Sequence, residues 1–247
     1  MRIVATRLHT TNEENLVSSS ELYTWCTHVL NYCDKLIVVV DSIYLEAIQN
    51  AKEDFQEKIE IFHINPWISF TQPLNLLVEK ALSLGAKELL FQSIEVDISL
   101  QDMEKLETHL TEDTLVVGAK LHEIHGDEKQ ICTKLDGWNT PWNTLALWNI
   151  DKLGVTGFLT ISSGNLEDIP GGIEEVVTIS LLQQLKKNEM KAKVINLSSV
   201  KWNTDWNSEQ REEYHKQKME SKNKRAQIQL EKLGIESGVV EILSEKE

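Results

Sequence analysis

The chain has 247 residues, 41% of them hydrophobic and 26% charged, so it can bury a full core as one large α/β domain. Its formal net charge of -14 argues against general nucleic-acid binding, because a phosphate backbone repels an acidic surface. No run of 18 apolar residues occurs, and no membrane span is expected. Cys26, Cys33 and Cys132 show no CxxC spacing, which argues against a disulfide framework and favours a cytoplasmic location.

The first half of the chain alternates between strand and helix patterns. Short apolar and β-branched runs predict strands at 3–5, 36–40, 59–64 and 88–91. Apolar residues spaced three and four apart predict helices between them, at 22–33, 44–56 and 74–82. This βαβαβαβ order implies a parallel sheet covered by helices, in which ligands bind at the carboxyl ends of the strands.

Acidic residues stand at two of these strand ends. Asp41 follows the run 36–40, and Glu95 and Asp97 follow the run 88–91. Side chains two apart in an extended segment point to the same side, so Glu95 and Asp97 are predicted to share a face. Mg²⁺ and Mn²⁺ prefer oxygen ligands, and Mg²⁺ is often held by one or two carboxylates plus substrate phosphates. The pair therefore predicts a metal and nucleotide site, with a solvated acidic turn as the alternative.

The second half of the chain places two more carboxylates at the start of a helix. A helix at 101–110 and a strand at 115–119 come first. Glycines at 171 and 172 then precede Glu174 and Glu175, which open a helical stripe at 176–185. At a helix N-terminus the helix dipole favours the ionised form of a carboxyl group, which is the form that a general base needs.

The C-terminal part is predicted to be polar. A last strand at 193–197 precedes a polar helix at 208–233. The basic residues between 211 and 225 are predicted to form a solvated helix face, with acidic lipid or an acidic partner as the alternative. The tail from residue 234 onward is expected to be loosely held.

Taken in order, these features resemble the GT-A glycosyltransferases, especially family-2-like ones. The resemblance covers about 1–205 and rests on Ala5-Thr6, Asp41-Ser42, Asn75 before a helix, Glu95-Val96-Asp97 and the glycine pair before Glu174-Glu175. It implies a Rossmann-like, mainly parallel sheet flanked by helices. The GT-A-like domain would span 1–205, with a nucleotide-binding half at 1–118 and an acceptor half at 119–205. Residues 206–247 would form a polar C-terminal helix and tail.

The resemblance also implies roles for single residues. It assigns the nucleobase to Asp41, a divalent Mn²⁺ or Mg²⁺ to Glu95 and Asp97, and the catalytic base to Glu175, beside Glu174. The nucleotide site would include Thr6, Asn75, Glu95 and Lys201. The histidine that this family places after the last strand is absent, and Lys201 would neutralise diphosphate there by charge.

Three residues of the Trp- and Asn-rich segment complete the predicted acceptor site. Trp138 and Trp142 offer flat apolar faces with a donor at the edge, which suits stacking on a sugar, and Asn143 follows them. Core packing is the alternative role for these tryptophans.

The predicted function is transfer of a sugar from a nucleotide-diphosphate donor to an acceptor hydroxyl, with metal assistance. Inversion at the anomeric carbon follows from the resemblance. Two alternatives stay open. One is a sugar-phosphate nucleotidyltransferase, although no Gly-rich, basic loop follows the first strand. The other is a non-catalytic member of the fold that binds a partner or a glycan.

Overall fold

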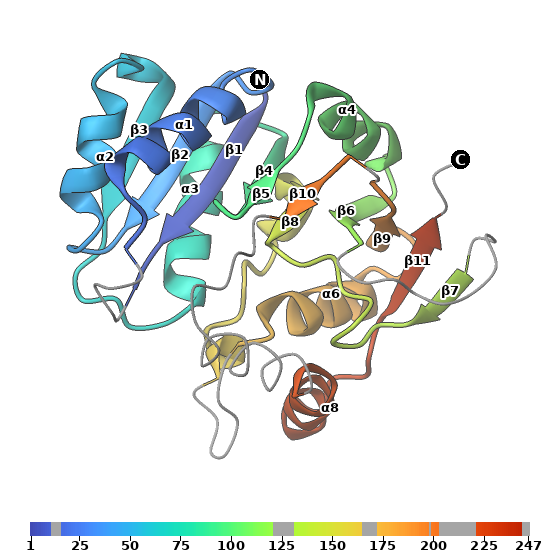
Figure 1. Cartoon of the computed structure of the whole chain (residues 1–247). Coiled ribbons are helices and arrows are strands. Elements are labelled where there is room, and N and C mark those ends of the chain that lie inside the picture. The colour runs from blue at the N-terminus through green and yellow to red at the C-terminus, as the bar shows by residue number, and fades with distance from the viewer. Residues whose placement is uncertain (11–15, 121–130, 165–171, 198, 203–220, 244–247) are drawn as a thin grey trace.

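A nine-stranded mixed sheet forms the centre of the molecule, with helices on both faces (Figure 1). The computed structural model describes residues 1–10, 16–120, 131–164, 172–197, 199–202 and 221–243. The strand order is β3-β2-β1-β4-β8-β6-β9-β11-β7. The strands of this sheet are β1 (Ile3–Leu8), β2 (Lys35–Val40), β3 (Ile59–His63), β4 (Glu88–Gln92), β6 (Thr114–Ala119), β7 (Ile131–Lys134), β8 (Leu145–Asn149), β9 (Lys191–Ile195) and β11 (Val239–Leu243).

The predicted parallel unit is confirmed in the first half. β3, β2, β1 and β4 pair in parallel, and the buried run of β2 explains why its sequence is almost wholly apolar. The helices between these strands are α1 (Ser19–Val29), α2 (Leu45–Lys52) and α3 (Thr71–Ser83). α1 begins earlier than its apolar stripe predicts, because Ser18 and Glu21 form a capping box at its start.

Two apolar layers separate the helices by face. Residues of α1, α2 and α4 (Leu100–His109) pack on one side of the sheet. Residues of α3, α5 (Ile150–Leu153), α6 (Glu174–Leu185) and α8 (Lys222–Leu233) pack on the other. A separate two-stranded sheet joins β5 (Val96–Asp97) to β10 (Lys201–Trp202).

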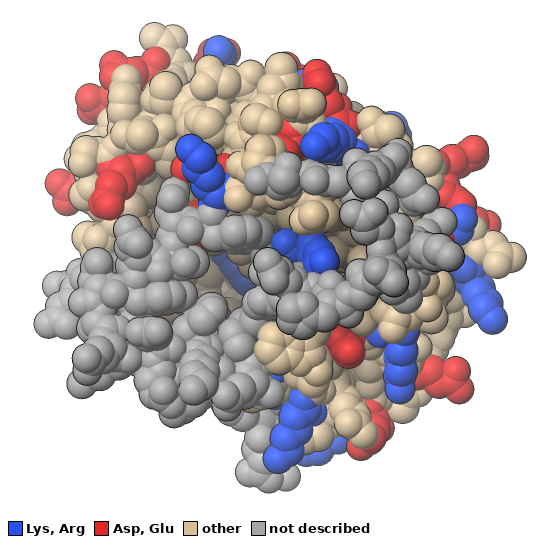
Figure 2. Space-filling model, turned by 45° about the vertical axis from the view of Figure 1, so that its right-hand side comes forward, with Lys and Arg blue, Asp and Glu red and all other residues tan. Residues whose placement is uncertain are grey.

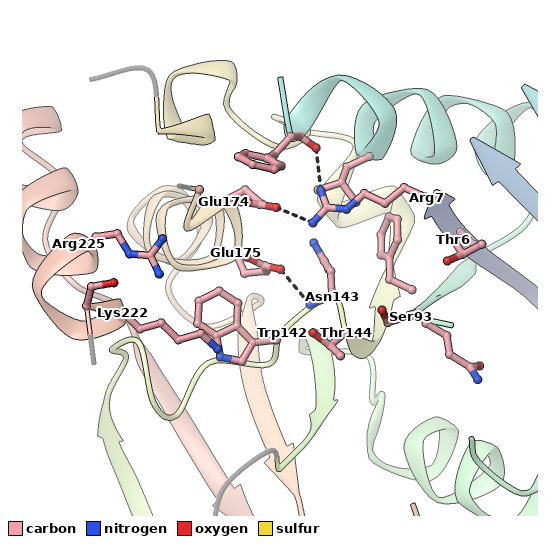
Figure 3. A pocket seen from close by; sticks show the side chains of 17 residues that line it. Thr6, Arg7, Ser93, Trp142, Asn143, Thr144, Glu174, Glu175, Lys222 and Arg225 are labelled. Carbon is pink, nitrogen blue, oxygen red and sulfur yellow. Dashed lines mark hydrogen bonds and ion pairs between the residues drawn. The ribbon is translucent and has the colours of Figure 1, made fainter. Parts of the chain in front are cut away.

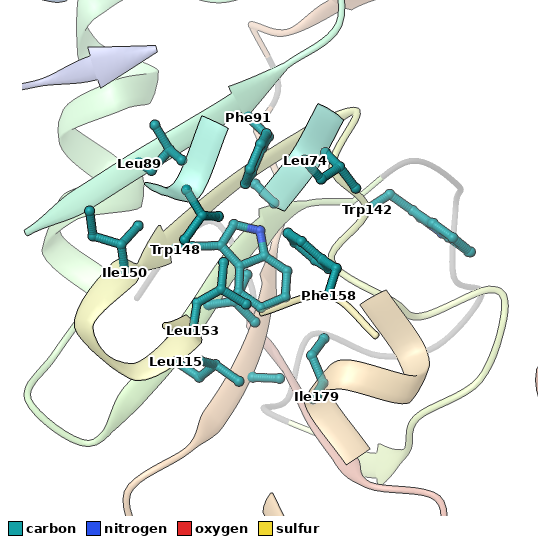
Figure 4. Packing of buried hydrophobic residues seen from close by; sticks show 14 of the residues in the cluster. Leu74, Leu89, Phe91, Leu115, Trp142, Trp148, Ile150, Leu153, Phe158 and Ile179 are labelled. Atoms are coloured by element: carbon teal, nitrogen blue, oxygen red, sulfur yellow. The ribbon is translucent and has the colours of Figure 1, made fainter. Parts of the chain in front are cut away.

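Trp148 of β8 is the largest fully buried side chain in the second of these layers (Figure 4). Its ring meets the Phe158 ring edge-on, with centroids 5.3 Å apart, and Phe91 packs against Phe158 in the same way at 5.8 Å. Edge-to-face pairs add about 0.5–1.5 kcal/mol beyond the burial of their area. This aromatic cluster holds β4, β8 and the segment before α6 together behind the candidate site.

The C-terminal tail is held in the sheet as far as Leu243, so the expectation of a loosely held tail was wrong for that part of it. β11 lies between β9, with which it is parallel, and β7, with which it is antiparallel. Val240 is fully buried and Leu243 nearly so, so apolar burial as well as backbone pairing holds the strand. Of the helix predicted at 208–233, only α8 lies within the described residues. In the described parts of the chain, no helix is long and apolar enough to cross a membrane.

Candidate active site

A cavity of about 530 Å³ opens at the carboxyl ends of β1 and β4 (Figure 3). This central cavity lies where ligands bind in sheets of this type. Its polar lining comes from five parts of the chain: Thr6 and Arg7, Gln92 and Ser93, Asn143 and Thr144, Glu174 and Glu175, and Ser221, Lys222 and Arg225. Figure 3 shows Lys222 and Arg225 on one side of Glu175, and Thr6 and Ser93 on the other.

Glu174 is held by an arginine from the first strand. Arg7 donates through Nη2 to Glu174 Oε1 at 3.2 Å and through Nη1 to the Phe70 carbonyl oxygen at 2.8 Å. Glu174 is buried, whereas Arg7 is about a third exposed. The ion pair links α6 to β1 and holds the Glu174 carboxylate at the cavity wall.

Glu175 is buried and accepts a hydrogen bond from the backbone N–H of Asn143, at 2.9 Å. Burial, and secondly the neighbouring Glu174 carboxylate, raise the pKa of Glu175 to about 8. The helix dipole was expected to favour the ionised form of Glu175, but burial makes the protonated form the favoured one at neutral pH. Desolvation outweighs the dipole because dipole effects are worth only about 0.3–2 kcal/mol.

Lys222 and Arg225 bring positive charge into the central cavity. They stand three apart on α8, so they share a face of the helix, and both are buried. The Lys222 ammonium lies 4.2 Å from the centroid of the Trp142 ring, a cation–π contact. The prediction of a solvated basic face was wrong for these two residues. Figure 2 shows basic side chains in and beside the hollow at the centre of one face, with most acidic side chains toward its margin.

The structure brings five of the predicted site residues to this one cavity: Thr6, Trp142, Asn143, Glu174 and Glu175. Trp138 is 40% exposed and does not line the cavity. Trp142 is 8% exposed, so most of its side chain packs in the core, which was the alternative role for this tryptophan.

Asp41 lies at the end of β2, as predicted, but its carboxylate is occupied by the protein. Its Oδ2 contacts His9 Nδ1 at 2.7 Å and accepts from the Thr10 backbone N–H at 3.1 Å. Its Oδ1 accepts from the backbone N–H groups of Ile43 and Tyr44, both at 3.0 Å. Four contacts use the acceptor capacity of a carboxylate, so a nucleobase would have to displace one of them.

Asn75 is likewise engaged within the fold. Its side-chain amide donates to the Phe158 carbonyl oxygen and accepts from the Phe158 N–H, each at 2.8 Å. It does not line the central cavity. In this position the amide ties α3 to the segment that follows α5.

Glu95 and Asp97 lie beside a different cavity, of about 460 Å³, which α1 covers. Glu95 is exposed and accepts a hydrogen bond from the Ser93 hydroxyl, and Asp97 pairs through its backbone with Lys201. Among the described residues, no group of three or more metal-ligating side chains is present. The pair supplies two carboxylates, so any bound ion would need further ligands from a substrate or from water. The metal prediction stays a prediction.

The basic residues that line the cavity, Arg7, Lys222 and Arg225, were not predicted as site residues from the sequence. A signal for Arg7 exists, because it shares the strand face of Ile3 and Ala5 and stands at the carboxyl end. For Lys222 and Arg225 the only signal is their spacing on a helix, which does not distinguish a buried basic pair from an exposed one.

Several solved structures are similar to this chain in fold. The 4-diphosphocytidyl-2C-methyl-D-erythritol synthase of Anaerococcus prevotii is 14% identical and aligns over 87% of this chain and 95% of its own, with a TM-score of 0.51. GalNAc-T7, solved with UDP, GalNAc and Mn²⁺, is 8% identical and aligns over 76% of this chain and 41% of its own, with a TM-score of 0.52. TarS from S. aureus is 12% identical over 66% of this chain and 31% of its own, at a TM-score of 0.45. No protein-family model and no curated protein matches the sequence.

The likeness to the Anaerococcus prevotii synthase and to GalNAc-T7 identifies the fold. The chain has the GT-A-like fold of nucleotide-diphospho-sugar transferases. The fold predicted from the sequence, a mainly parallel sheet flanked by helices, is confirmed.

Proposed function

We propose that this protein transfers a sugar from a nucleotide-diphosphate donor to an acceptor hydroxyl in the central cavity. The observation that carries the proposal is the combination of a buried carboxyl group of raised pKa, Glu175, with three cations, Arg7, Lys222 and Arg225, in one cavity of a GT-A-like fold. A general base is most effective when its pKa lies near the working pH, and a diphosphate needs positive charge around it.

The cations give the cavity a charge that suits a diphosphate. Three basic side chains line it, against Glu174 and Glu175, and a protonated Glu175 adds no negative charge. Lys222 and Arg225, on the same helical face, would neutralise the charge that builds on the diphosphate as the bond to the sugar breaks. Arg7 would hold Glu174 in place and add to the same field.

Glu175 would carry the proton transfer. In its ionised form it takes the proton of the acceptor hydroxyl as that oxygen attacks the anomeric carbon of the donor. The bond from that carbon to the diphosphate breaks, and its electron pair leaves with the diphosphate. One base facing one leaving group gives a single displacement with inversion, an outcome taken from the family resemblance.

Whether Mn²⁺ or Mg²⁺ assists the reaction is a separate part of this proposal. Glu95 and Asp97 are the residues that would hold the ion, and it would supply charge stabilisation to the diphosphate. Asp97→Ala should abolish any strengthening of UDP binding by Mn²⁺, measured by calorimetry. Equal UDP affinity in EDTA and in millimolar Mn²⁺ would show that the cations of the central cavity suffice.

A nucleotidyltransferase is the second candidate. The synthase from Anaerococcus prevotii aligns over nearly all of its own length, and the basic cavity would suit a triphosphate as well as a diphosphate. The two enzymes differ in their products, because a nucleotidyltransferase releases pyrophosphate and a glycosyltransferase releases a nucleoside diphosphate or monophosphate. A non-catalytic binding protein would release neither.

The test is a screen of UDP-, GDP-, CMP- and dTDP-sugars, with and without Mn²⁺, for binding and for release of nucleotide. A parallel screen of nucleoside triphosphates with sugar phosphates measures pyrophosphate. Nucleotide released from one class of sugar donor supports the proposal. Pyrophosphate alone would support the second candidate, and binding without any release would support a non-catalytic role. A cytoplasmic location stays a prediction.

A further inference from the structure

A chain of hydrogen bonds runs from the core to the catalytic carboxyl group through Asn143. The indole N–H of Trp148 donates to Asn143 Oδ1 at 2.8 Å, and the Asn143 backbone N–H donates to Glu175 Oε1 at 2.9 Å. An indole nitrogen is a donor only, so it selects the oxygen of the Asn143 amide. The amide nitrogen, Nδ2, is thereby directed away from Trp148 and toward the central cavity, as Figure 3 shows.

This arrangement leaves one donor and one acceptor unused at the cavity floor. Asn143 Nδ2 and Glu175 Oε2 are both buried, and neither has a partner among the described residues. Both residues line the central cavity, and both are more than nine-tenths buried. Buried polar atoms without a partner are few in native proteins, and at a candidate active site they point to a group supplied by a ligand.

The chemistry of the two atoms defines that group. An ionised Glu175 accepts a hydrogen bond and the Asn143 amide donates one, so the matching group must donate and accept at once. A neutral hydroxyl does both. A carboxylate only accepts, and an ammonium group only donates.

We infer that Trp148 is a positioning residue, which orients the Asn143 amide so that Asn143 and Glu175 together select a neutral hydroxyl as the acceptor. This inference rests on the proposed function, because the hydroxyl that it concerns is the acceptor of that reaction. Trp148 touches no substrate and acts through Asn143 alone. Its rigid place between Phe158 and the sheet fixes the amide before the acceptor binds.

Protonation of Glu175 controls this selection. Among the described residues, the charged groups that line the cavity with it are Glu174 on its own helix, Arg7 from β1, and Lys222 and Arg225 from α8. When Glu175 is protonated, its Oε2 becomes a second donor beside Asn143, and the pair then matches an anion better than a hydroxyl. Hydroxyl binding should therefore strengthen as the pH rises through the titration of Glu175.

The first experiment follows the Asn143 side-chain amide by NMR in the full chain, with its signals assigned by their loss in Asn143→Asp. Glycerol, as a neutral polyol, should shift these signals at pH 9, and methylammonium should not. Acetate, whose carboxylate only accepts hydrogen bonds at both pH values, should shift them at pH 6 more than at pH 9. Equal shifts by glycerol and methylammonium at pH 9 would overturn the selection of a hydroxyl.

The second experiment tests Trp148 itself. Trp148→Phe keeps an aromatic ring and removes the N–H, and it should weaken glycerol binding about five- to tenfold without changing the affinity for UDP. The double variant Trp148→Phe/Asn143→Ala should be no weaker than Asn143→Ala, since Trp148 acts through Asn143. Trp25→Phe is the matched control, because Trp25 is also buried and its N–H has no partner among the described residues.

Other outcomes separate this inference from the proposed function. If Trp148→Phe lowers glycerol and UDP affinity alike, or leaves glycerol binding unchanged, the positioning role fails. Should Trp148→Phe not fold, Asn143→Asp must produce the same loss, because a carboxylate at this place cannot donate. If the NMR results hold but no nucleotide-sugar is turned over, the hydroxyl site stands and the proposed transfer reaction fails.

Discussion

Burial sets the protonation of Glu175, and this makes its carboxyl group usable as a base near neutral pH. Full desolvation and the adjacent Glu174 oppose ionisation, while the Asn143 N–H and the Arg7 charge favour it. The result is a carboxyl group that loses its proton near pH 8 rather than near pH 4.5. Two adjacent glutamates thus differ in role, since Glu174 is engaged by Arg7 and Glu175 is not bonded to a cation in the described contacts.

Glu175→Gln should lower kcat about 10²- to 10⁴-fold, the typical worth of a general base, and leave UDP affinity nearly unchanged. Steady-state kinetics with the donor found by the screen, together with UDP calorimetry, measure the two quantities. The rate of the parent protein should rise with pH up to about 8 and then level off. Glu174→Gln is the matched control. Full activity in Glu175→Gln with loss in Glu174→Gln would exchange the two roles.

The same group makes stability depend on pH. In the folded protein Glu175 keeps its proton up to about pH 8, whereas an unfolded chain releases it near 4.5. Between these values the folded state binds more protons, so the free energy of unfolding falls as the pH rises. Over this window the loss is on the order of a few kcal/mol, at about 1.4 kcal/mol per pKa unit.

Urea unfolding of the parent protein and of Glu175→Gln, at pH 5, 6.5 and 8.5, tests this expectation. Glutamine does not titrate, so the variant should gain stability relative to the parent as the pH rises. Parallel pH dependences of the two proteins would show that Glu175 ionises normally.

At the residue scale, sequence reasoning singled out two pairs of neighbouring residues that the structure brings to one cavity, and their roles stay predictions. Glu174, Glu175, Trp142 and Asn143 were predicted for one half of the site, and they do line one cavity. Asp41 was placed correctly at a strand end, but its four contacts involve the segments after β1 and β2, which strand periodicity does not describe. Whether a carboxylate at a strand end faces a ligand or its own backbone depends on such loop geometry.

At the scale of elements, α8 supplies two of the three cations that line the cavity in the described part of the chain, and a glycine allows the close approach of this helix. A β-carbon on Gly137 would lie 2.5 Å from the Lys222 carbonyl carbon and 2.7 Å from the Asn223 nitrogen. These are backbone atoms, which cannot rotate away as a side-chain end can. The start of α8, and with it Lys222, therefore depends on the absence of a side chain at 137.

Gly137→Ala should displace the start of α8 and weaken UDP binding several-fold, because Lys222 moves away from the cavity. Gly85→Ala is the control: its positive φ of 74° strains the backbone by about 1–2 kcal/mol, but a β-carbon there meets nothing within 4 Å. Calorimetry with UDP measures the effect of each variant on binding, and thermal unfolding measures its effect on stability. Comparable UDP affinity in the two variants would contradict the role of Gly137.

The strands of the second half were harder to predict than those of the first. β8 runs antiparallel between β4 and β6, and its short apolar run follows a segment rich in Trp and Asn. The first four strands follow a repeating βα order, so each supports the prediction of the next. β8 and β11 enter the sheet from distant parts of the chain, and local periodicity carries no information about such pairing.

For the whole molecule, β11 is the strand that joins β7 to the rest of the sheet. Its side chains alternate, with Val240 fully buried and its neighbour Val239 half exposed. Val240→Asp should lower the free energy of unfolding by at least about 3 kcal/mol, because it buries a charge without a partner. Val239→Asp should cost less than about 1 kcal/mol. Chemical denaturation measures both, and equal effects would show that β11 is not packed as described.

The place of β11 also bears on how the protein is made. A ribosome delivers β7 well before β11, yet β7 pairs with no other strand of the described sheet. During synthesis β7 therefore has no partner strand, and one edge of β9 is open. β11 covers both strands only when it leaves the ribosome. The growing chain thus exposes an unpaired strand, β7, and the free edge of β9 at the same time, and such unpaired edges make a nascent chain prone to aggregation.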